Sequence, residues 1–238
     1  MKVDILAIGV HPDDLELACS GTIIKAIQDG KTVAILDLTQ GELGTRGTPE
    51  LRRIEATNSA KILGVSERIG LNMGDGFFEH NNENMLEIAK YIRHFQPEIV
   101  FANAMHDRHP DHGRAGKLIS DACFYSGLVK IETSLNGELQ KAHRPKTVYH
   151  YIQDYYTNPD LVVDVSDVWD PKIESILAYS SQFYNPKSKE PETPISSKAF
   201  MDFIEGRGTQ FGRLINVKYG EGFTMAKPPG VNQIFDVK

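Results

Sequence analysis

The hydrophobic positions of the chain alternate between short apolar runs and stretches with helical spacing. Residues 3–10 form a near-continuous apolar run, which is typical of a strand buried on both faces of a sheet. Residues 15–29 then carry apolar side chains at helical spacing, and a glycine follows to end the helix. The same order recurs with a strand at residues 33–38 and a helix at residues 49–63. This alternation predicts a parallel sheet with helices on both faces.

The alternation continues through the first two-thirds of the chain. A weak strand near residues 68–71 precedes a clear amphipathic helix that ends before Pro97. Further strands are expected at residues 98–102, 147–152 and 161–165, with helices that end near Ser126 and begin at Asp170. We therefore expect an α/β fold with a Rossmann-like, doubly wound, mostly parallel sheet, and residues 1–238 as a single domain.

Two irregular segments stand out between the expected elements. Residues 185–197 are polar and rich in proline, and we expect an exposed loop there that could act as a lid. Residues 75–78 form either part of a pocket or a simple turn before core aromatics.

Composition excludes several classes of protein. The 238 residues include 40% hydrophobic positions, enough for a full core. The 26 Lys and Arg are outnumbered by 32 Asp and Glu, and a net charge of −6 is opposite in sign to what nucleic-acid binding requires. No apolar run approaches the roughly 20 residues of a membrane span, and the two cysteines form no thiolate metal motif. We expect a cytoplasmic protein with neither nucleic acid nor membrane as a partner.

The turn after the first apolar run argues against a dinucleotide site. Such a site needs Gly-x-Gly-x-x-Gly at this place, whereas the chain contains Gly9-Val-His-Pro-Asp-Asp14. Carboxylates here would repel phosphate, so a cation site is favoured.

The tripeptide His-Pro-Asp occurs twice, at residues 11–13 and 109–111. One copy follows the first expected strand and the other follows the fourth. In the common order of a doubly wound sheet these two strands are neighbours, and ligands bind beyond their carboxyl ends. We therefore expect the two motifs to meet at one site.

Imidazole and carboxylate without thiolate suit Zn²⁺ or Fe²⁺. His11 and Asp14 can face one point, and either His109 or His112 would supply a third ligand. Two histidines, one carboxylate and an open position make a hydrolytic zinc site, in which Asp13 could take a proton from water. Alternatively, Asp13 simply caps the following helix. A non-haem iron oxygenase and a non-enzymatic metal- or sugar-binding module are the rival interpretations.

The paired His-Pro-Asp motifs resemble those of the LmbE/PIG-L family of zinc-dependent N-acetylglucosamine deacetylases. The resemblance covers nearly the whole chain and includes residues 39–47, 50–56, 181–183 and 219–223. These segments are similar to the branch that deacetylates N-acetylglucosaminyl malate in bacillithiol biosynthesis. The implied reaction removes acetate from such a conjugate. An inositol glycoside or a chito-oligosaccharide is the alternative substrate, and the oxygenase is the more distant alternative.

The resemblance also implies a metal site and a catalytic base. His11, Asp14 and His112 would bind one zinc ion per chain, with Fe²⁺ as the alternative metal. Asp13 would be the general base that activates water. The family resemblance further suggests a homo-oligomer.

The remaining implied roles concern the leaving group and the substrate. His109 would stabilise the oxyanion or protonate the leaving amine, with Asp111 orienting its imidazole. Arg52 and Arg108 would bind the substrate, because guanidinium groups suit the carboxylates of a malyl group. Where the malate branch carries a tyrosine in the C-terminal helix, the closest residue here is Phe200, which cannot donate a hydrogen bond.

Overall fold

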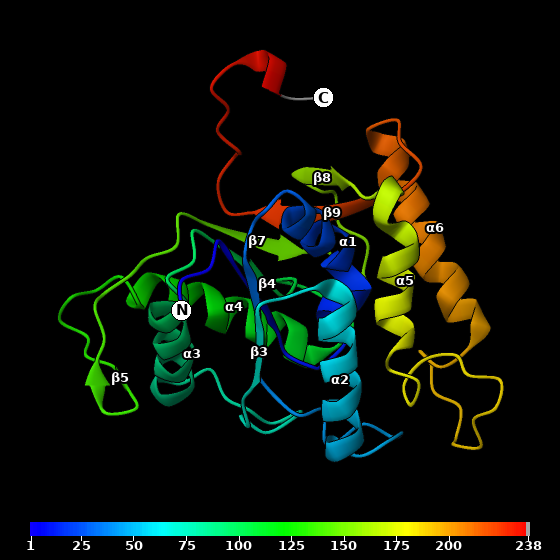
Figure 1. The fold of residues 1–238 in the computed structure, drawn as a ribbon, viewed down its shortest axis with the longest axis horizontal. Helices are drawn as coiled ribbons and strands as arrows, with labels where there is room; N and C mark the ends of the chain where they lie inside the picture. Colours follow the sequence, from blue (N-terminus) through cyan, green and yellow to red (C-terminus); the bar gives the residue numbers. More distant parts are fainter. Residues whose placement is uncertain (237–238) are drawn as a thin grey trace.

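The computed structural model describes residues 1–236, and its centre is a seven-stranded sheet (Figure 1). The strands are β1 (Ile5–Gly9), β2 (Val33–Asp37), β3 (Glu67–Gly70), β4 (Ile99–Ala102), β7 (Thr147–Tyr151), β8 (Leu161–Asp164) and β9 (Gly220–Met225). Their order is β3-β2-β1-β4-β7-β9-β8, and the pairs from β3 to β7 are parallel. Strand β9 is antiparallel to both of its neighbours. The mostly parallel sheet predicted from the sequence is confirmed.

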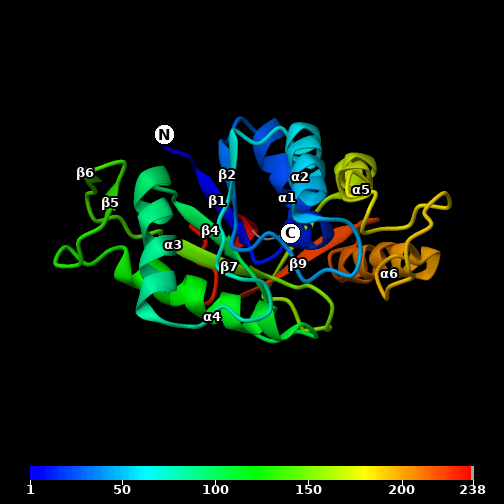
Figure 2. The same cartoon turned by 90° about the horizontal axis from the view of Figure 1, so that it is seen from below.

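Helices cover both faces of this sheet, as the view in Figure 2 shows. They are α1 (Asp14–Gln28), α2 (Pro49–Leu63), α3 (Asn82–Phe95), α4 (Pro110–Tyr125), α5 (Trp169–Leu177) and α6 (Lys198–Leu214). Helices α1, α2 and α5 pack on one face and α3 and α4 on the other, while α6 packs against β9. A small hairpin joins β5 (Ser134–Leu135) to β6 (Glu138–Leu139), and short 3-10 turns span Ser166–Val168 and Ile234–Asp236. In the described part of the chain, no helix has the length and apolar character needed to cross a membrane.

Helix α2 shows how local sequence sets an element's ends. The hydroxyl of Thr48 accepts a hydrogen bond from the amide of Leu51, and Pro49 occupies the first turn, where its missing N–H has no cost. At the other end Gly64 adopts a left-handed conformation with φ 77°, which glycine adopts without strain. The sequence predicts these same bounds, 49–63.

The strand side chains divide between two cores. Alternate residues of β1 and β2 point to opposite faces, and all are buried. One set packs with α1, α5 and α6, and the other with α3 and α4. The first set contains Ile5, Ala7, Val33 and Ile35, and the second contains Leu6, Ile8, Ala34 and Leu36.

The sequence pattern did not predict β9, because its burial depends on distant partners. Glycine in this strand admits the ring of Phe211, to which a Cβ at Gly222 would approach within 3.0 Å. The buried carboxylate of Glu221 lies 2.9 Å from the amine of Lys172. The first half of this strand is Gly-Glu-Gly, which carries no apolar alternation, so its place in the sheet could not be inferred locally.

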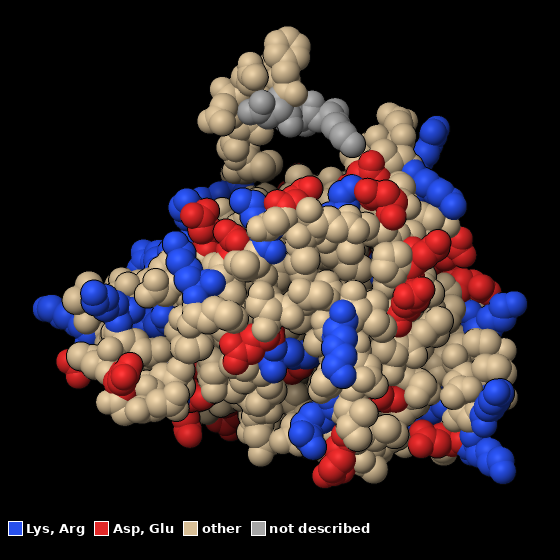
Figure 3. Space-filling model, in the orientation of Figure 1, with Lys and Arg blue, Asp and Glu red and all other residues tan. Residues whose placement is uncertain are grey.

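Charged side chains also hold the edge of the sheet. On the face shown in Figure 3, basic and acidic side chains are interspersed at the surface. Beneath the surface, the guanidinium of Arg68 lies 2.6 Å from Asp37 and 2.6 Å from Glu16, with its side chain only 7% exposed. Arg68 therefore joins β3 to β2 and α1 through two buried carboxylates.

Replacing this arginine tests how strongly the network holds the fold. Arg68→Met leaves both carboxylates buried without their cation, and we expect the free energy of unfolding to fall by about 3–5 kcal/mol. Urea denaturation followed by circular dichroism measures it. The control is Arg53→Met on the exposed face of α2, which should change stability by less than about 0.5 kcal/mol. A loss below about 1 kcal/mol for Arg68→Met would show that the network contributes little.

Candidate active site

The parallel pairing of β1 with β4 brings the two His-Pro-Asp motifs together. In the register of this pair, Ile5 lies opposite Ile99 and the strands end at the same edge. The imidazole of His11 consequently lies 4.8 Å from that of His109 and 5.5 Å from that of His112, measured between ring centroids. The meeting of the two motifs follows from the predicted strand order.

Asp14 connects the two motifs. Its Oδ2 accepts hydrogen bonds from the amides of Val10 and His11, both at 3.0 Å. Its Oδ1 lies 3.1 Å from Nε2 of His112, and Nδ1 of His11 lies 3.8 Å from Oδ2. Burial alone would raise the pKa of Asp14, but the two imidazoles hold it well below its usual value. Asp14 is therefore an ionised carboxylate placed between two histidines.

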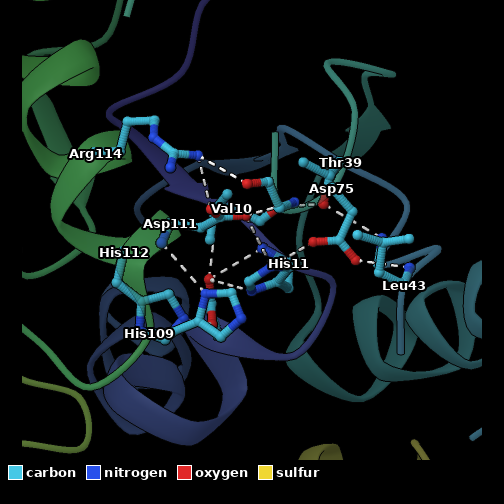
Figure 4. Close-up of polar contacts among 12 residues, drawn as sticks. Val10, His11, Thr39, Leu43, Asp75, His109, Asp111, His112 and Arg114 are labelled. Atoms are coloured by element: carbon cyan, nitrogen blue, oxygen red, sulfur yellow. Dashed lines mark hydrogen bonds and ion pairs between the residues drawn. The ribbon is translucent and has the colours of Figure 1, made fainter. Parts of the chain in front are cut away.

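The other nitrogen of His11 faces two further carboxylates, as Figure 4 shows. Its Nε2 lies 2.9 Å from Asp75 and 3.6 Å from Asp111. Although burial acts to lower the pKa of His11, hydrogen bonds to Asp111, Asp14 and Asp75 raise it well above its usual value. The second oxygen of Asp75 accepts from the amide of Leu43. Asp75 thus belongs to the site and lines the cavity, in agreement with the pocket alternative for residues 75–78, although the sequence did not indicate its contact with His11.

His112 is held in a similar way by residues that sequence reasoning missed. Its Nδ1 lies 2.5 Å from Asp107, whose other oxygen accepts hydrogen bonds from two backbone amides, including that of Tyr155. The side-chain amide nitrogen of Gln153 lies 3.1 Å from Asp14 and 3.5 Å from Nε2 of His112. Burial acts to lower the pKa of His112, but the carboxylates of Asp14 and Asp107 raise it to about 9. Of these residues, only Asp107 carries a sequence signal, its place in the His-rich segment.

Asp13 occupies the N-cap position of α1 but does not cap it. Its side chain makes no cap hydrogen bond, and one carboxylate oxygen lies 2.9 Å from Arg52 instead. Its backbone has φ 138°, a conformation that is strained for any residue with a Cβ and that clusters at functional sites. Burial raises the pKa of Asp13 to about 7, although Arg52 acts in the opposite direction. The capping alternative therefore does not describe this residue.

The two arginines expected at the substrate are both engaged with the protein. Arg52 lines the cavity, but its terminal nitrogens donate to the carbonyls of Gly41 and Pro12 and to Asp13. Arg108 also lines the cavity, is 46% exposed and pairs with Asp154 at 2.9 Å. Arg52 is thus a support for Asp13, and Arg108 lies at the exposed rim.

The imidazole of His109 contacts the backbone of Asp111. Its Nδ1 accepts a hydrogen bond from the backbone amide of Asp111 at 3.3 Å. The Asp111 carboxylate instead accepts from the amide of Gly76 and from Arg114, each at 2.8 Å. Asp111 thus contacts the His109 imidazole through its backbone amide, while its carboxylate is turned toward His11 and Arg114 (Figure 4). The orienting role of Asp111 stays a prediction.

His11, Asp13, Asp14, His109 and His112 line a cavity of about 300 Å³. Its far wall comes from α6 and from residues 193–195 of the segment expected as a lid. Glu190 of the same segment lies 3.3 Å from Arg46. Phe200 also lines the cavity and stacks on Phe183 with ring centroids 6.2 Å apart, so it offers a ring face there.

The donor set fits a divalent cation. Among residues 1–236, two groups of three side chains have ligand atoms within 4.8 Å of one another, and both include His11. One group adds His109 and His112, and the other adds Asp75 and Asp111. In the triad expected from sequence, Asp14 turns a different oxygen toward each imidazole. Nitrogen and carboxylate donors without sulfur suit zinc or ferrous iron.

The fold and cavity define an α/β protein with a cation-compatible His/Asp site at the carboxyl ends of its parallel strands. A family model described as PIG-L, GlcNAc-PI de-N-acetylase, matches residues 6–123. The diacetylchitobiose deacetylase of Thermococcus kodakarensis is 31% identical over an alignment of 238 positions, which covers 95% of this chain and 84% of that protein. The crystal structure of the conserved protein TT1542 from Thermus thermophilus matches with a TM-score of 0.85 and 33% identity, over 98% of each chain.

The chain therefore belongs to the LmbE/PIG-L family of deacetylases. As a member of this family it is a hydrolase that acts on amides. A probable N-acetyl-alpha-D-glucosaminyl L-malate deacetylase 2 of Bacillus cereus is 25% identical over 201 residues, which cover 76% of this chain and 84% of that protein. The family resemblance seen in the sequence is confirmed.

Proposed function

We propose that the protein is a zinc-dependent deacetylase of an N-acetylglucosaminyl conjugate, with N-acetylglucosaminyl malate as the first candidate substrate. The observation that carries the proposal is the buried carboxylate of Asp13, strained in its backbone and held by Arg52 beside the His/Asp cluster. In the reaction, water adds to the acetyl carbon and the C–N bond breaks. The products are acetate and the free amine of the sugar.

His11, Asp14 and His112 are the proposed metal ligands. Asp75 and Asp107 hydrogen-bond the second nitrogens of the two imidazoles, as carboxylates commonly do around zinc-binding histidines. When bound, zinc supplies Lewis-acid polarisation of the acetyl carbonyl and acidifies water. Ferrous iron suits the same donors and is the alternative metal.

Side chains of the protein accept and donate the protons of the proposed reaction. Asp13 accepts a proton from the attacking water, and Arg52 fixes its carboxylate during that transfer. His109, which lines the same cavity, donates a hydrogen bond to the developing oxyanion or a proton to the leaving amine. Arg108 contacts the substrate at the rim of the cavity.

Two relatives are named for different substrates. The relative at 31% identity is named for diacetylchitobiose, and one at 25% is named for the malate conjugate. The motifs at residues 39–47, 50–56, 181–183 and 219–223 support the malate conjugate. A chito-oligosaccharide and an inositol glycoside are the alternatives.

Acetate release tests the function directly. We expect zinc-loaded protein to release acetate from N-acetylglucosaminyl malate faster than from diacetylchitobiose or the inositol glycoside, and chelation to abolish release until zinc is restored. An enzyme-coupled acetate assay measures all three rates. Faster turnover of a neutral conjugate would keep the deacetylase and reject the malate assignment. No acetate from any conjugate would reject the proposed function.

Replacement of Asp13 tests the general base. Asp13→Asn keeps the size of the side chain but removes its ability to accept a proton, and we expect turnover to fall by about 10²–10⁴-fold. Zinc content, measured by mass spectrometry, should stay that of the wild type. Asp29→Asn, at the exposed far end of α1, is the matched control and should turn over normally. Turnover by Asp13→Asn at the wild-type rate would eliminate Asp13 as the base.

Zinc retention discriminates between the candidate ligand sets. Asp14→Asn should lose bound zinc, since it removes a proposed ligand. Asp75→Asn acts only through His11, so we expect it to retain one zinc ion with about 10–100-fold weaker affinity. Competition with a fluorescent chelator measures both affinities, and thermal denaturation confirms that each variant is folded. The reverse order of affinities would assign the metal to the group formed by His11, Asp75 and Asp111.

A further inference from the structure

Three arginines line the cavity, and their partners differ. Arg52 lies 2.9 Å from Asp13, and Arg108 lies 2.9 Å from Asp154. Arg207, the third, forms no ion pair with a carboxylate of the described residues. It is therefore the cavity arginine that no carboxylate of the described residues contacts directly, although Asp154, Asp107 and Glu221 act on it from a distance.

The position of Arg207 is fixed by two contacts. One terminal nitrogen donates to the carbonyl of Leu17 at 2.9 Å. This carbonyl is free of the helix because α1 is kinked at Cys19 and the amide of Gly21 donates to Glu221 instead; it also accepts from the amine of Lys172 at 3.1 Å. The guanidinium carbon also lies 5.4 Å from the ring centroid of Phe203. A guanidinium has five N–H donors, so most of its donors stay available to a ligand.

The surroundings of Arg207 favour a bound anion. Its cavity neighbours on α6 and the preceding segment are apolar and include Phe203, Ile204 and Ile195. Burial lowers the pKa of Arg207 to about 10, although Asp154, Asp107 and Glu221 act in the opposite direction, so the group is charged at neutral pH. Arg207 is partly buried at the cavity, and a planar guanidinium binds carboxylates in bidentate fashion.

Arg207 also lies close to the proposed chemistry. The amide of Leu17 donates to the carbonyl of Asp13, so the carbonyl that anchors Arg207 belongs to the residue one helical turn beyond the base. One turn of α-helix rises about 5.4 Å. A small substrate whose acetamide reaches Asp13 can therefore present an acidic group to Arg207.

We propose that Arg207 binds a carboxylate of the substrate's aglycone and so selects acidic N-acetylglucosaminyl conjugates over neutral ones. The inference rests on the proposed deacetylase function and deepens it. The sequence analysis expected Arg52 and Arg108 to bind the substrate carboxylates, whereas this inference gives that role to Arg207 on α6. Arg207 is a specificity residue, outside the proton transfers.

A selectivity ratio tests this assignment. For wild type and variants, kcat/KM is measured on N-acetylglucosaminyl malate and on the neutral methyl N-acetylglucosaminide. We expect the malyl-to-methyl ratio to fall about 10- to 100-fold in Arg207→Gln and to recover in part in Arg207→Lys, which keeps the charge. Arg213→Gln, on an exposed position of the same helix, should leave the ratio within about twofold of wild type. An unchanged ratio in Arg207→Gln, or an equal loss on both substrates, would overturn the inference.

A binding measurement separates this inference from the proposed function. L-malate alone is titrated by calorimetry into protein freed of metal and dialysed free of chelator. Its Kd should weaken at least about tenfold in Arg207→Gln and stay unchanged in Arg213→Gln. Equal affinity in wild type and Arg207→Gln would refute the role of Arg207. If the zinc-loaded wild type released no acetate from either glycoside, the deacetylase function would fail, and this titration would still decide whether Arg207 binds carboxylates.

Discussion

The parallel pairing of β1 with β4 is the constraint on which the site depends. Both strands end at one edge of the sheet, and a helix begins within a few residues of each end. Residues 10–13 and 103–109 form these connections, so both His-Pro-Asp motifs lie at this edge of the sheet. The positive φ of Asp13 is part of the same geometry, because the chain must turn sharply from β1 into α1. Such strain persists where surrounding contacts hold the residue, and here Arg52 holds the Asp13 carboxylate from α2.

Concentrating carboxylates at this edge requires cations from elsewhere in the fold. Arg52 reaches Asp13 from α2, and Arg68 reaches Asp37 and Glu16 from the edge strand β3. Each of these pairs is almost fully buried, so each partner is needed to offset the desolvation of the other. Stability and site geometry consequently depend on the same contacts. Arg52 thereby fixes α2 to the proposed base, and Arg68 fixes β3 to two carboxylates on β2 and α1.

The sequence predicts those features that are encoded locally. Apolar runs identified the buried strands, and Thr48 and Gly64 marked the ends of α2 because caps act within one turn. The two motifs could be placed at one site because strand order follows a general rule. The same reasoning could not find Gln153 or the contact of Asp75 with His11, because these contacts span 139 and 64 residues of sequence. It also could not foresee β9, in which glycine and glutamate are buried by tertiary contacts.

The different partners of the cavity arginines explain why one arginine cannot both hold Asp13 and bind a substrate carboxylate. If Arg52 released Asp13 to bind a substrate carboxylate, the acid would be left buried without its cation. A charged substrate group is therefore better received by an arginine that supports no catalytic residue. Arg207 meets this condition because it donates to a backbone carbonyl on α1, which stays in place whether or not a ligand is bound. The base and the aglycone are then held by separate guanidinium groups on α2 and α6, and the substrate can bind without disturbing the carboxylate that acts on it.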